Sequence, residues 1–259
     1  MKDEVLPGQR YEVTWGEPKR PQFQLWDNNP YVSPVYGVPR PVALVGGKGH
    51  SLQVLHENRF QVPEGFILTP DLLEMPTFRG GRGEGFVEAV SSLFGILSTD
   101  LAVRSSATTE DGENTSFAGQ HKSYFVTRST PKTLHHAVLG VCLSLTDSAA
   151  YREAHGLGPT RMAVIVQRML HPSLAGVLFT QDPVTHTPGI VVECVAGLAD
   201  KLVSGHVTPG GEEMLDKVQK KKLFTEAERA KKVFGCELDM EWVFVGKNLW
   251  FVQARPVTA

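Results

Sequence analysis

The stretch that decides the fold reads Glu241-Trp-Val-Phe-Val245, then Gly246-Lys-Asn248, then Leu249-Trp-Phe-Val-Gln253. Two runs of aromatic and β-branched residues, separated by a short segment that contains glycine, are typical of a β-hairpin. Because both faces of this hairpin carry large apolar side chains, we expect it to lie in the centre of a sheet.

The register of this hairpin decides whether it carries a cation site. With a three-residue turn, Glu241 faces Gln253, and the two Cβ atoms lie about 5 Å apart. A carboxylate and an amide oxygen at that spacing suit a hard cation such as Mg2+, and Arg255 on the same face suits a phosphate. Two alternatives remain open. Glu241 could be the structural partner of Arg255, or a two-residue turn could shift the register and undo the pairing.

The remainder of the chain mixes short apolar runs with amphipathic helical patterns, which predicts an α+β fold. Runs of strand length lie at residues 41–45, 62–69, 101–103, 162–166, 176–179 and 190–195. Helical periodicity follows residue 49, spans 86–97, begins again at the N-cap signal Thr130-Pro131, and begins a last time at the capping-box pattern of Thr225. The polar stretch 104–120 is expected to be a loop.

Two short segments offer cations at the ends of expected strands. Gly46-Gly47-Lys48-Gly49 combines glycines that allow close approach to the backbone with a lysine and the start of a helix. Taken alone, this motif is explained equally well as a tight turn. Arg104 comes directly after the run 101–103, and three hydroxyl side chains follow it within four residues. Since Lys48, Arg104 and Arg255 all lie at strand boundaries, where ligand sites collect, we treat them as candidate phosphate-binding residues.

Composition excludes several classes of function. The chain has 259 residues, 41% of them hydrophobic, with 26 Lys+Arg against 28 Asp+Glu, which is typical of one large or two small globular domains. A net charge of -2 leaves no excess of positive charge for nucleic acid or an anionic membrane as the main partner. The three cysteines lie far apart, and neither a signal peptide nor a membrane-spanning run is evident. We therefore expect a cytoplasmic protein.

Blocks spread along most of the chain resemble one known family. They are 46–49, 62–66, 103–111, 116–120, 167–169, 175–185, 203–209, 240–242 and 253–258. In this order they closely resemble the nucleotide-binding domain of the phosphoenolpyruvate synthase and pyruvate phosphate dikinase family, which includes rifampin phosphotransferase. The resemblance implies an ATP-grasp fold, in which two α+β subdomains hold ATP between them, and phosphate transfer from ATP with Mg2+.

The resemblance also implies roles for individual residues. Lys48, Arg104 and Arg255 are expected to act on the phosphates, and Glu241 with Gln253 to bind Mg2+. The segment 105–120 is expected to be a flap over the phosphates. The expected nucleotide contacts are Gly47, Lys48, Arg104, Ser105, Ser106, Thr108, Gly119, Gln120, Gln167, Arg168, Met169, Leu170 and Arg255, where the backbone of 167–170 forms a hinge that meets adenine.

The expected organisation is a Pro- and aromatic-rich arm (1–41), a first subdomain (42–160) and a second subdomain (161–259). Family members usually continue into a swivelling domain with a phosphorylatable His, whereas this chain stops at Ala259. The expected acceptor is therefore a His on a separate domain or chain, or a small molecule. Gly197-Leu198-Ala199-Asp200 departs from the usual Gly-Leu-Gly-Glu. An ATP-grasp ligase acting through an acyl phosphate and a non-catalytic nucleotide-binding module remain as alternatives.

Overall fold

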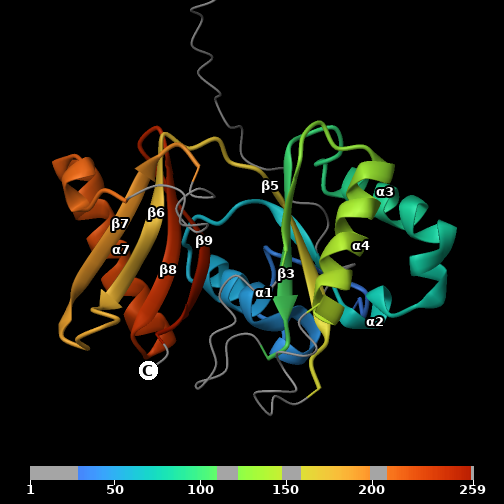
Figure 1. Ribbon diagram of the computed structural model, residues 1–259, viewed down its shortest axis with the longest axis horizontal. Coiled ribbons are helices and arrows are strands. Elements are labelled where there is room, and N and C mark those ends of the chain that lie inside the picture. The colour runs from blue at the N-terminus through green and yellow to red at the C-terminus, as the bar shows by residue number, and fades with distance from the viewer. Residues whose placement is uncertain (1–28, 110–121, 148–158, 199–208, 258–259) are drawn as a thin grey trace, which may run out of the picture.

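The computed structural model of the protein describes residues 29–109, 122–147, 159–198 and 209–257. Within these ranges the chain folds into two antiparallel sheets with helices packed against them (Figure 1). The α+β class expected from the sequence is therefore confirmed. None of the helices in these ranges is both long and apolar enough to cross a lipid bilayer.

The first sheet is built around β5 and β3. In sheet order its strands are β1 (Val32–Pro34), β2 (Gly65–Leu68), β5 (Met162–Arg168), β3 (Leu101–Ala107) and β4 (Ser123–Val126). Side chains alternate across this sheet, so Phe66 and Val164 join one buried cluster while Ile67 and Ile165 join another. The first cluster is completed by α2 (Pro70–Leu73), the short turn η2 (Phe78–Arg82), α3 (Gly83–Leu93) and α4 (Pro131–Asp147). The opposite face is covered by α1 (Val42–Glu57).

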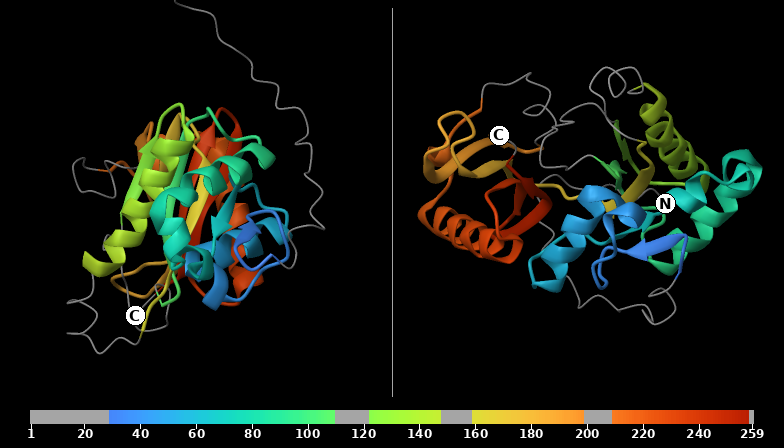
Figure 2. Two further views of the ribbon diagram at one scale, coloured as in Figure 1. Left: turned by 90° about the vertical axis from the view of Figure 1, so that its right-hand side faces the viewer. Right: turned by 90° about the horizontal axis from the view of Figure 1, so that it is seen from below.

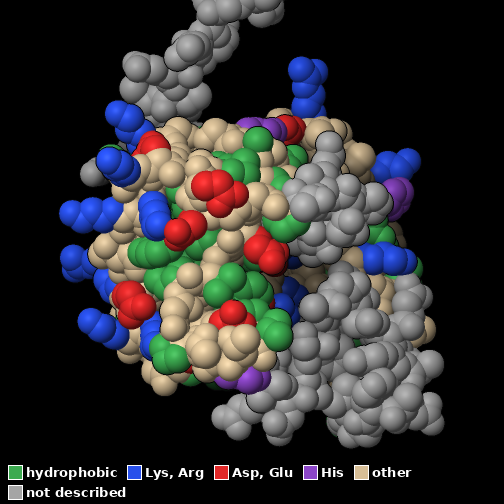
Figure 3. Space-filling view, turned by 60° about the vertical axis from the view of Figure 1, so that its left-hand side comes forward, with side chains coloured by type: hydrophobic (Ala, Val, Ile, Leu, Met, Phe, Trp, Pro, Cys, Tyr) green, Lys and Arg blue, Asp and Glu red, His purple; other side chains and the backbone are tan. Residues whose placement is uncertain are grey.

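The second sheet contains the predicted hairpin. In sheet order its strands are β7 (Pro188–Ala196), β6 (Leu174–Gln181), β8 (Leu238–Val245) and β9 (Asn248–Pro256), and the turn η3 (Glu212–Met214) precedes α7 (Lys217–Phe234). Among the described strands β8 is interior but β9 is at the edge, so the expected central position of the whole hairpin is wrong. Leu223 and Ala227 of α7 are buried against Trp242 and Phe244 of β8. The lysine-rich side of α7 faces solvent, and Lys and Arg side chains gather along the left flank of the view in Figure 3.

One hydrophobic cluster joins the two sheets. It contains Leu52 and Leu55 of α1 together with Phe251 of β9, so α1 packs against both subdomains (Figure 2). Phe60, which follows α1, meets Phe251 edge to face, with the ring centroids 5.7 Å apart. This shared core fixes how the two sheets face each other.

Several helices and strands begin or end at residues other than those predicted. Residues 42–45 form a first helical turn rather than a strand, because α1 includes them and kinks at Gly46, where φ is 70°. β3 continues through Ala107, so 104–107 is strand instead of loop. The α3 helix ends at Leu93, not at residue 97.

The last helix also starts earlier than predicted. Asp216 caps α7 by accepting from the backbone N–H groups of Val218 and Gln219, and the Gln219 side chain completes a capping box. Thr225, predicted as the N-cap, lies inside the helix. By contrast, α4 begins at Pro131, as predicted from the N-cap signal.

The boundaries of the two subdomains also shift. β5 pairs with β2 and β3, so the first sheet extends to Arg168 and the second begins at Leu174, later than the expected boundary at 161. Residues 32–34 of the expected arm form β1 at the edge of the first sheet. Residues 1–28 lie outside the described part of the chain.

Candidate functional site

The glycine-rich turn is fastened to β3 by a buried serine. The hydroxyl of Ser106 donates to the carbonyl oxygen of Val45 at 2.7 Å and accepts from the N–H of Gly49 at 2.9 Å. Gly46 passes so close that a Cβ there would lie 2.0 Å from the backbone oxygen of Ser106. The turn that carries Lys48 is therefore held against the strand that carries Arg104.

Arg104 reaches from the first sheet to the hairpin of the second. Its Nη2 donates to Oε2 of Glu241 at 2.7 Å and to Oε1 of Gln253 at 3.1 Å. Its Nη1 donates to the backbone oxygen of Val252 at 2.5 Å. The side chains of Arg104 and Glu241 are only 16% and 25% exposed. The structure thus brings a residue predicted to bind phosphate against both residues predicted to bind the metal.

Glu241 pairs with Gln253 as predicted, but the turn and the register that produce this pairing differ from those predicted. Its turn has two residues, because Val245 pairs with Asn248, so the expected three-residue turn is wrong. A register shift then places Glu241 opposite Gln253 although Trp242 lies opposite Phe251. The extra residue in β9 forms a β-bulge, which puts Phe251 in the core and Gln253 on the other face with Glu241.

This bulge also contributes an oxygen. Val252 is the extra residue between Phe251 and Gln253, and its carbonyl oxygen is the one that accepts from Arg104. The bulge therefore gathers three oxygens of different types around a single guanidinium group.

Arg255 has a different partner from the one considered from the sequence. Its Nε and Nη2 both donate to Oδ2 of Asp239, at 2.8 and 2.6 Å, and the two residues are direct cross-strand neighbours. Burial raises the pKa of the Asp239 carboxyl, and the charge of Arg255 opposes that rise. The alternative in which Arg255 is the structural partner of Glu241 is therefore wrong.

Asp239 was not identified from the sequence, although a signal was present. It lies two residues before Glu241 on the same strand, so period-two alternation places both carboxylates on one face of β8. Asp239 is 8% exposed and holds Arg255 beside the expected metal ligands.

The expected hinge connects the sheets, but its two polar side chains, Gln167 and Arg168, already have partners. Gln167 is buried, and its Nε2 donates to the carbonyl oxygen of Pro63 at 3.0 Å. The Nε of Arg168 donates to Glu64 at 3.0 Å. Met169 and Leu170 are half-buried between β5 and β6. The polar side chains of Gln167 and Arg168 are therefore engaged within the protein, and the expected contact of this segment with adenine stays a prediction.

The remaining predicted contacts are buried, half-buried or outside the described residues. Ser105 and Gly47 are buried, and Lys48 is half-buried. The hydroxyl of Thr108 accepts from the backbone N–H of Arg161 at 3.0 Å. Ser106 is fully buried and its hydroxyl is engaged by α1, so it supports the glycine-rich turn instead of facing a ligand in this conformation. Gly119 and Gln120, most of the flap, and Ala199-Asp200 lie outside the described residues.

The donor set of the hairpin suits a magnesium ion. Glu241 and Gln253 supply a carboxylate and an amide oxygen, and the positive guanidinium of Arg104 already lies against both, as a stand-in for a cation. Across the described ranges, three or more His, Cys, Asp or Glu side chains nowhere gather into a metal-binding group. Two protein oxygens are what Mg2+ typically takes when phosphates and water complete its coordination.

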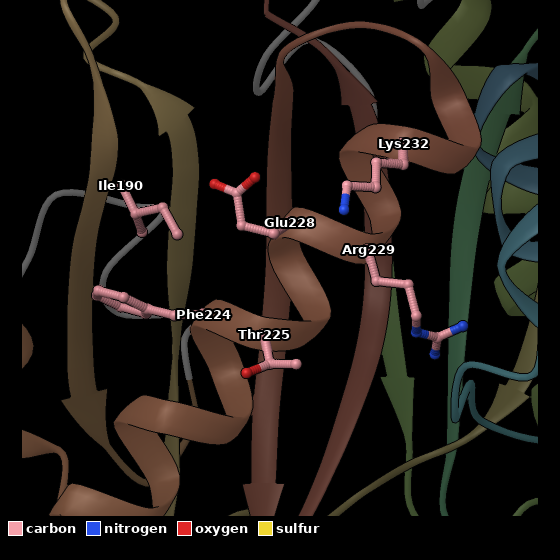
Figure 4. Close-up of a pocket in the computed structure, with 6 residues that line it drawn as sticks. All are labelled: Ile190, Phe224, Thr225, Glu228, Arg229 and Lys232. Atoms are coloured by element: carbon pink, nitrogen blue, oxygen red, sulfur yellow. The ribbon is translucent and has the colours of Figure 1, made fainter.

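A separate pocket of about 660 Å³ lies between β7 and α7. Ile190 and Phe224 face each other across it, and Glu228 points toward it from α7 (Figure 4). Its described lining is Ile190, Phe224, Thr225, Glu228, Arg229 and Lys232. None of these is among the residues predicted to bind nucleotide or metal.

Comparison with known proteins defines the class of the chain. Residues 84–214 match the family model described as pyruvate phosphate dikinase, AMP/ATP-binding domain. The match covers half of the chain, and the protein belongs to this family. The resemblance inferred from the sequence motifs is confirmed.

Individual relatives share about a quarter of their residues with this chain in the aligned regions. The chain is 27% identical to rifampicin phosphotransferase of Bacillus cereus, over 83% of this chain and 34% of that protein. It is 25% identical to a probable phosphoenolpyruvate synthase of Archaeoglobus fulgidus, over 84% of this chain and 40% of that protein. The chain thus spans about a third of the length of the curated relatives it matches.

A solved structure of D-alanine–D-alanine ligase from Bacillus anthracis complexed with ATP also matches. It is 10% identical, with a TM-score of 0.45, over 83% of this chain and 55% of that chain.

Proposed function

We propose that this protein is an ATP- and Mg2+-dependent phosphotransferase of the phosphoenolpyruvate synthase type, with an ATP-grasp site between its two subdomains. Its phosphoryl acceptor is either a His on a separate swivelling domain or a small molecule. The observation that supports this most strongly is the contact of Arg104 on β3 with Glu241 and Gln253 on the hairpin. This contact joins a residue of the first sheet that is predicted to bind phosphate to two residues of the second sheet that are predicted to bind the metal.

The chain's own residues supply most of the required electrostatics. Lys48, Arg104 and Arg255 come from three separate segments, and in the proposed site each would stabilise the negative charge of a transferring phosphoryl group. Ser106 fixes the turn that carries Lys48, and Asp239 fixes the orientation of Arg255. Phosphoryl transfer requires little covalent chemistry from the protein, so such positioning is the main contribution.

Glu241 and Gln253 would hold the magnesium ion. When bound, Mg2+ supplies positive charge that neutralises the phosphate oxygens during transfer. The backbone of the 167–170 hinge would meet the adenine, and the flap, which includes Gly119 and Gln120, would cover the phosphates.

Calorimetry tests the binding step. The wild-type chain should bind ATP in the presence of Mg2+ and gain thermal stability from it, and Lys48→Ala should lower the affinity. Absence of ATP binding by the wild-type chain with Mg2+ present would overturn the proposal. Incubation with ATP labelled at either the β or the γ phosphate then shows which group moves, and whether the label appears on protein histidine or on a small molecule.

A further inference from the structure

Arg104 occupies the oxygens that the proposed function assigns to the metal. Its guanidinium donates to Glu241, Gln253 and the carbonyl oxygen of Val252 at distances of 2.5 to 3.1 Å. We name these four residues the arginine clamp. A guanidinium is always charged, so in this conformation the metal ligands are already neutralised by a cation that belongs to the protein.

We propose that the arginine clamp closes the metal site until the phosphates of a nucleotide draw Arg104 away, so that divalent metal binds well only after, or together with, the nucleotide. The inference rests on the proposed function, because it regulates the same site. It goes beyond that function by making Arg104 a competitor of the metal as well as a phosphate ligand.

Competition follows from charge and geometry. A divalent ion on Oε2 of Glu241 would lie within a few ångströms of the guanidinium of Arg104, which donates to that same oxygen at 2.7 Å. Two cations at that separation repel strongly in a partly buried site. Both side chains are largely buried, so water cannot readily replace either partner. Metal alone must therefore displace a well-bonded arginine.

A nucleotide removes this obstacle because it offers Arg104 another anion. Phosphate oxygens accept two parallel hydrogen bonds from a guanidinium, in the manner of a carboxylate. Once Arg104 turns to the phosphate, Glu241 and Gln253 are released as a pair. Their relative position does not depend on Arg104, since it is set by the hairpin register and the bulge at Val252.

The same contacts connect the two subdomains. Arg104 belongs to the first sheet, and its three acceptors belong to the second. Opening of the clamp therefore breaks three hydrogen bonds between the sheets. Because linkage is reciprocal, the factor by which nucleotide raises metal affinity is the factor by which metal raises nucleotide affinity.

Binding of Mn2+ in the absence of nucleotide tests the clamp, with free Mn2+ measured by electron paramagnetic resonance. Arg104→Met should bind Mn2+ about tenfold more tightly than the wild type, a factor within the usual range of coupling between sites. In the same variant, affinity for ATP should fall. Unchanged or weaker Mn2+ binding by the folded variant would overturn the clamp.

Three further variants make the result specific. The gain of Arg104→Met should disappear in the double variant Arg104→Met/Glu241→Gln, and persistence of the gain would show that Glu241 is not the ligand. Arg161→Met releases two exposed carboxylates, Asp71 and Glu74, and should leave Mn2+ affinity at the wild-type value. An equal gain in that control would overturn the clamp. If Arg104→Met does not fold, Arg104→Gln removes the charge but keeps a donor toward Glu241, and it should change Mn2+ affinity in the same direction.

The outcomes separate the clamp from the proposed function. If neither the wild type nor any variant binds ATP but Arg104→Met gains Mn2+ affinity, the competition between Arg104 and the metal stands, whereas release of the clamp by ATP and the proposed function both fail. If ATP binds with Mg2+ but Mn2+ affinity is the same with and without Arg104, the clamp fails and the proposed function stands.

Discussion

Two arginine–carboxylate pairs involve carboxylates of the hairpin strand β8, and they differ in what they connect. Arg255 and Asp239 are neighbours on β9 and β8, within one hairpin. Arg104 and Glu241 come from different sheets and are separated by 137 residues in the sequence. The first pair follows from strand register, so it does not depend on how the two sheets face each other. The second depends on how the subdomains face each other, so it can exchange partners when a ligand enters.

The largest effect is expected on breaking the pair within the hairpin. Arg255→Met leaves the carboxylate of Asp239 buried without its partner, and we expect a loss of about 3 to 5 kcal/mol in the free energy of unfolding. Urea denaturation of the ligand-free protein measures this loss. Asp239→Asn, which removes the charge together with the pairing, should lose less. An equal loss in both variants would contradict a role for the unpaired charge.

Acid should reduce the deficit of Arg255→Met. Burial raises the pKa of Asp239 in the folded state, and without Arg255 nothing on the hairpin opposes that rise as strongly. A carboxyl with a raised folded pKa contributes stability below its unfolded pKa, and that contribution is lost as the pH rises through the folded pKa. The stability of the variant, measured relative to the wild type, should therefore improve as the pH falls through the raised pKa of Asp239. A deficit that does not change with pH would contradict this assignment.

The pair between the sheets should behave differently. Glu241→Gln keeps an acceptor for Arg104, which also retains Val252 and Gln253, so we expect a loss of only about 1 to 2 kcal/mol in unfolding free energy. The same change should weaken the Mg2+-dependent part of ATP binding about 100-fold, as expected for removal of one strong electrostatic group. Calorimetry with and without Mg2+ measures this part separately. A larger stability loss than in Arg255→Met would contradict the comparison.

An intermediate effect is expected where β3 holds the glycine-rich turn. Ser106→Ala leaves a buried carbonyl and a buried N–H of α1 unpaired, which should lower the unfolding free energy by about 2 kcal/mol and weaken ATP binding as well. Ser144→Ala is the matched control, since its buried hydroxyl donates only to Val141 within the same helix. Equal losses in the two variants would show that Ser106 has no special role in the turn.

The smallest effect is expected at a third arginine–carboxylate group, on the surface. Arg161 bonds Asp71 and Glu74, but all three side chains are 41 to 49% exposed. Arg161→Met should therefore change the unfolding free energy by less than about 1 kcal/mol, and the change should vanish in high salt. A salt-independent loss comparable to that of Arg255→Met would show that exposure is not what separates the three groups.

Local patterns carried much of the architecture. The hairpin at 241–253, the N-cap at Thr130-Pro131 and the strand at β2 follow from periodicity and turn chemistry within a few residues. Where two local patterns competed, the tertiary structure chose between them. Residues 42–45 have the composition of a strand, yet they form a helical turn in which the N–H groups of Leu44 and Val45 donate to the carbonyl oxygen of Pro41, and Gly46 then bends the chain onto Ser106.

The sequence by itself determined the α+β class, the family and the identities of the polar residues on the hairpin, because side-chain alternation and the order of motifs are local properties of the chain. Only the tertiary structure decided their partners. Glu241 faces Gln253 because a bulge at Val252 offsets a two-residue turn, and Glu241 meets Arg104 because the shared core around α1 fixes one sheet against the other. Such contacts depend on the packing of whole sheets, which no local periodicity encodes.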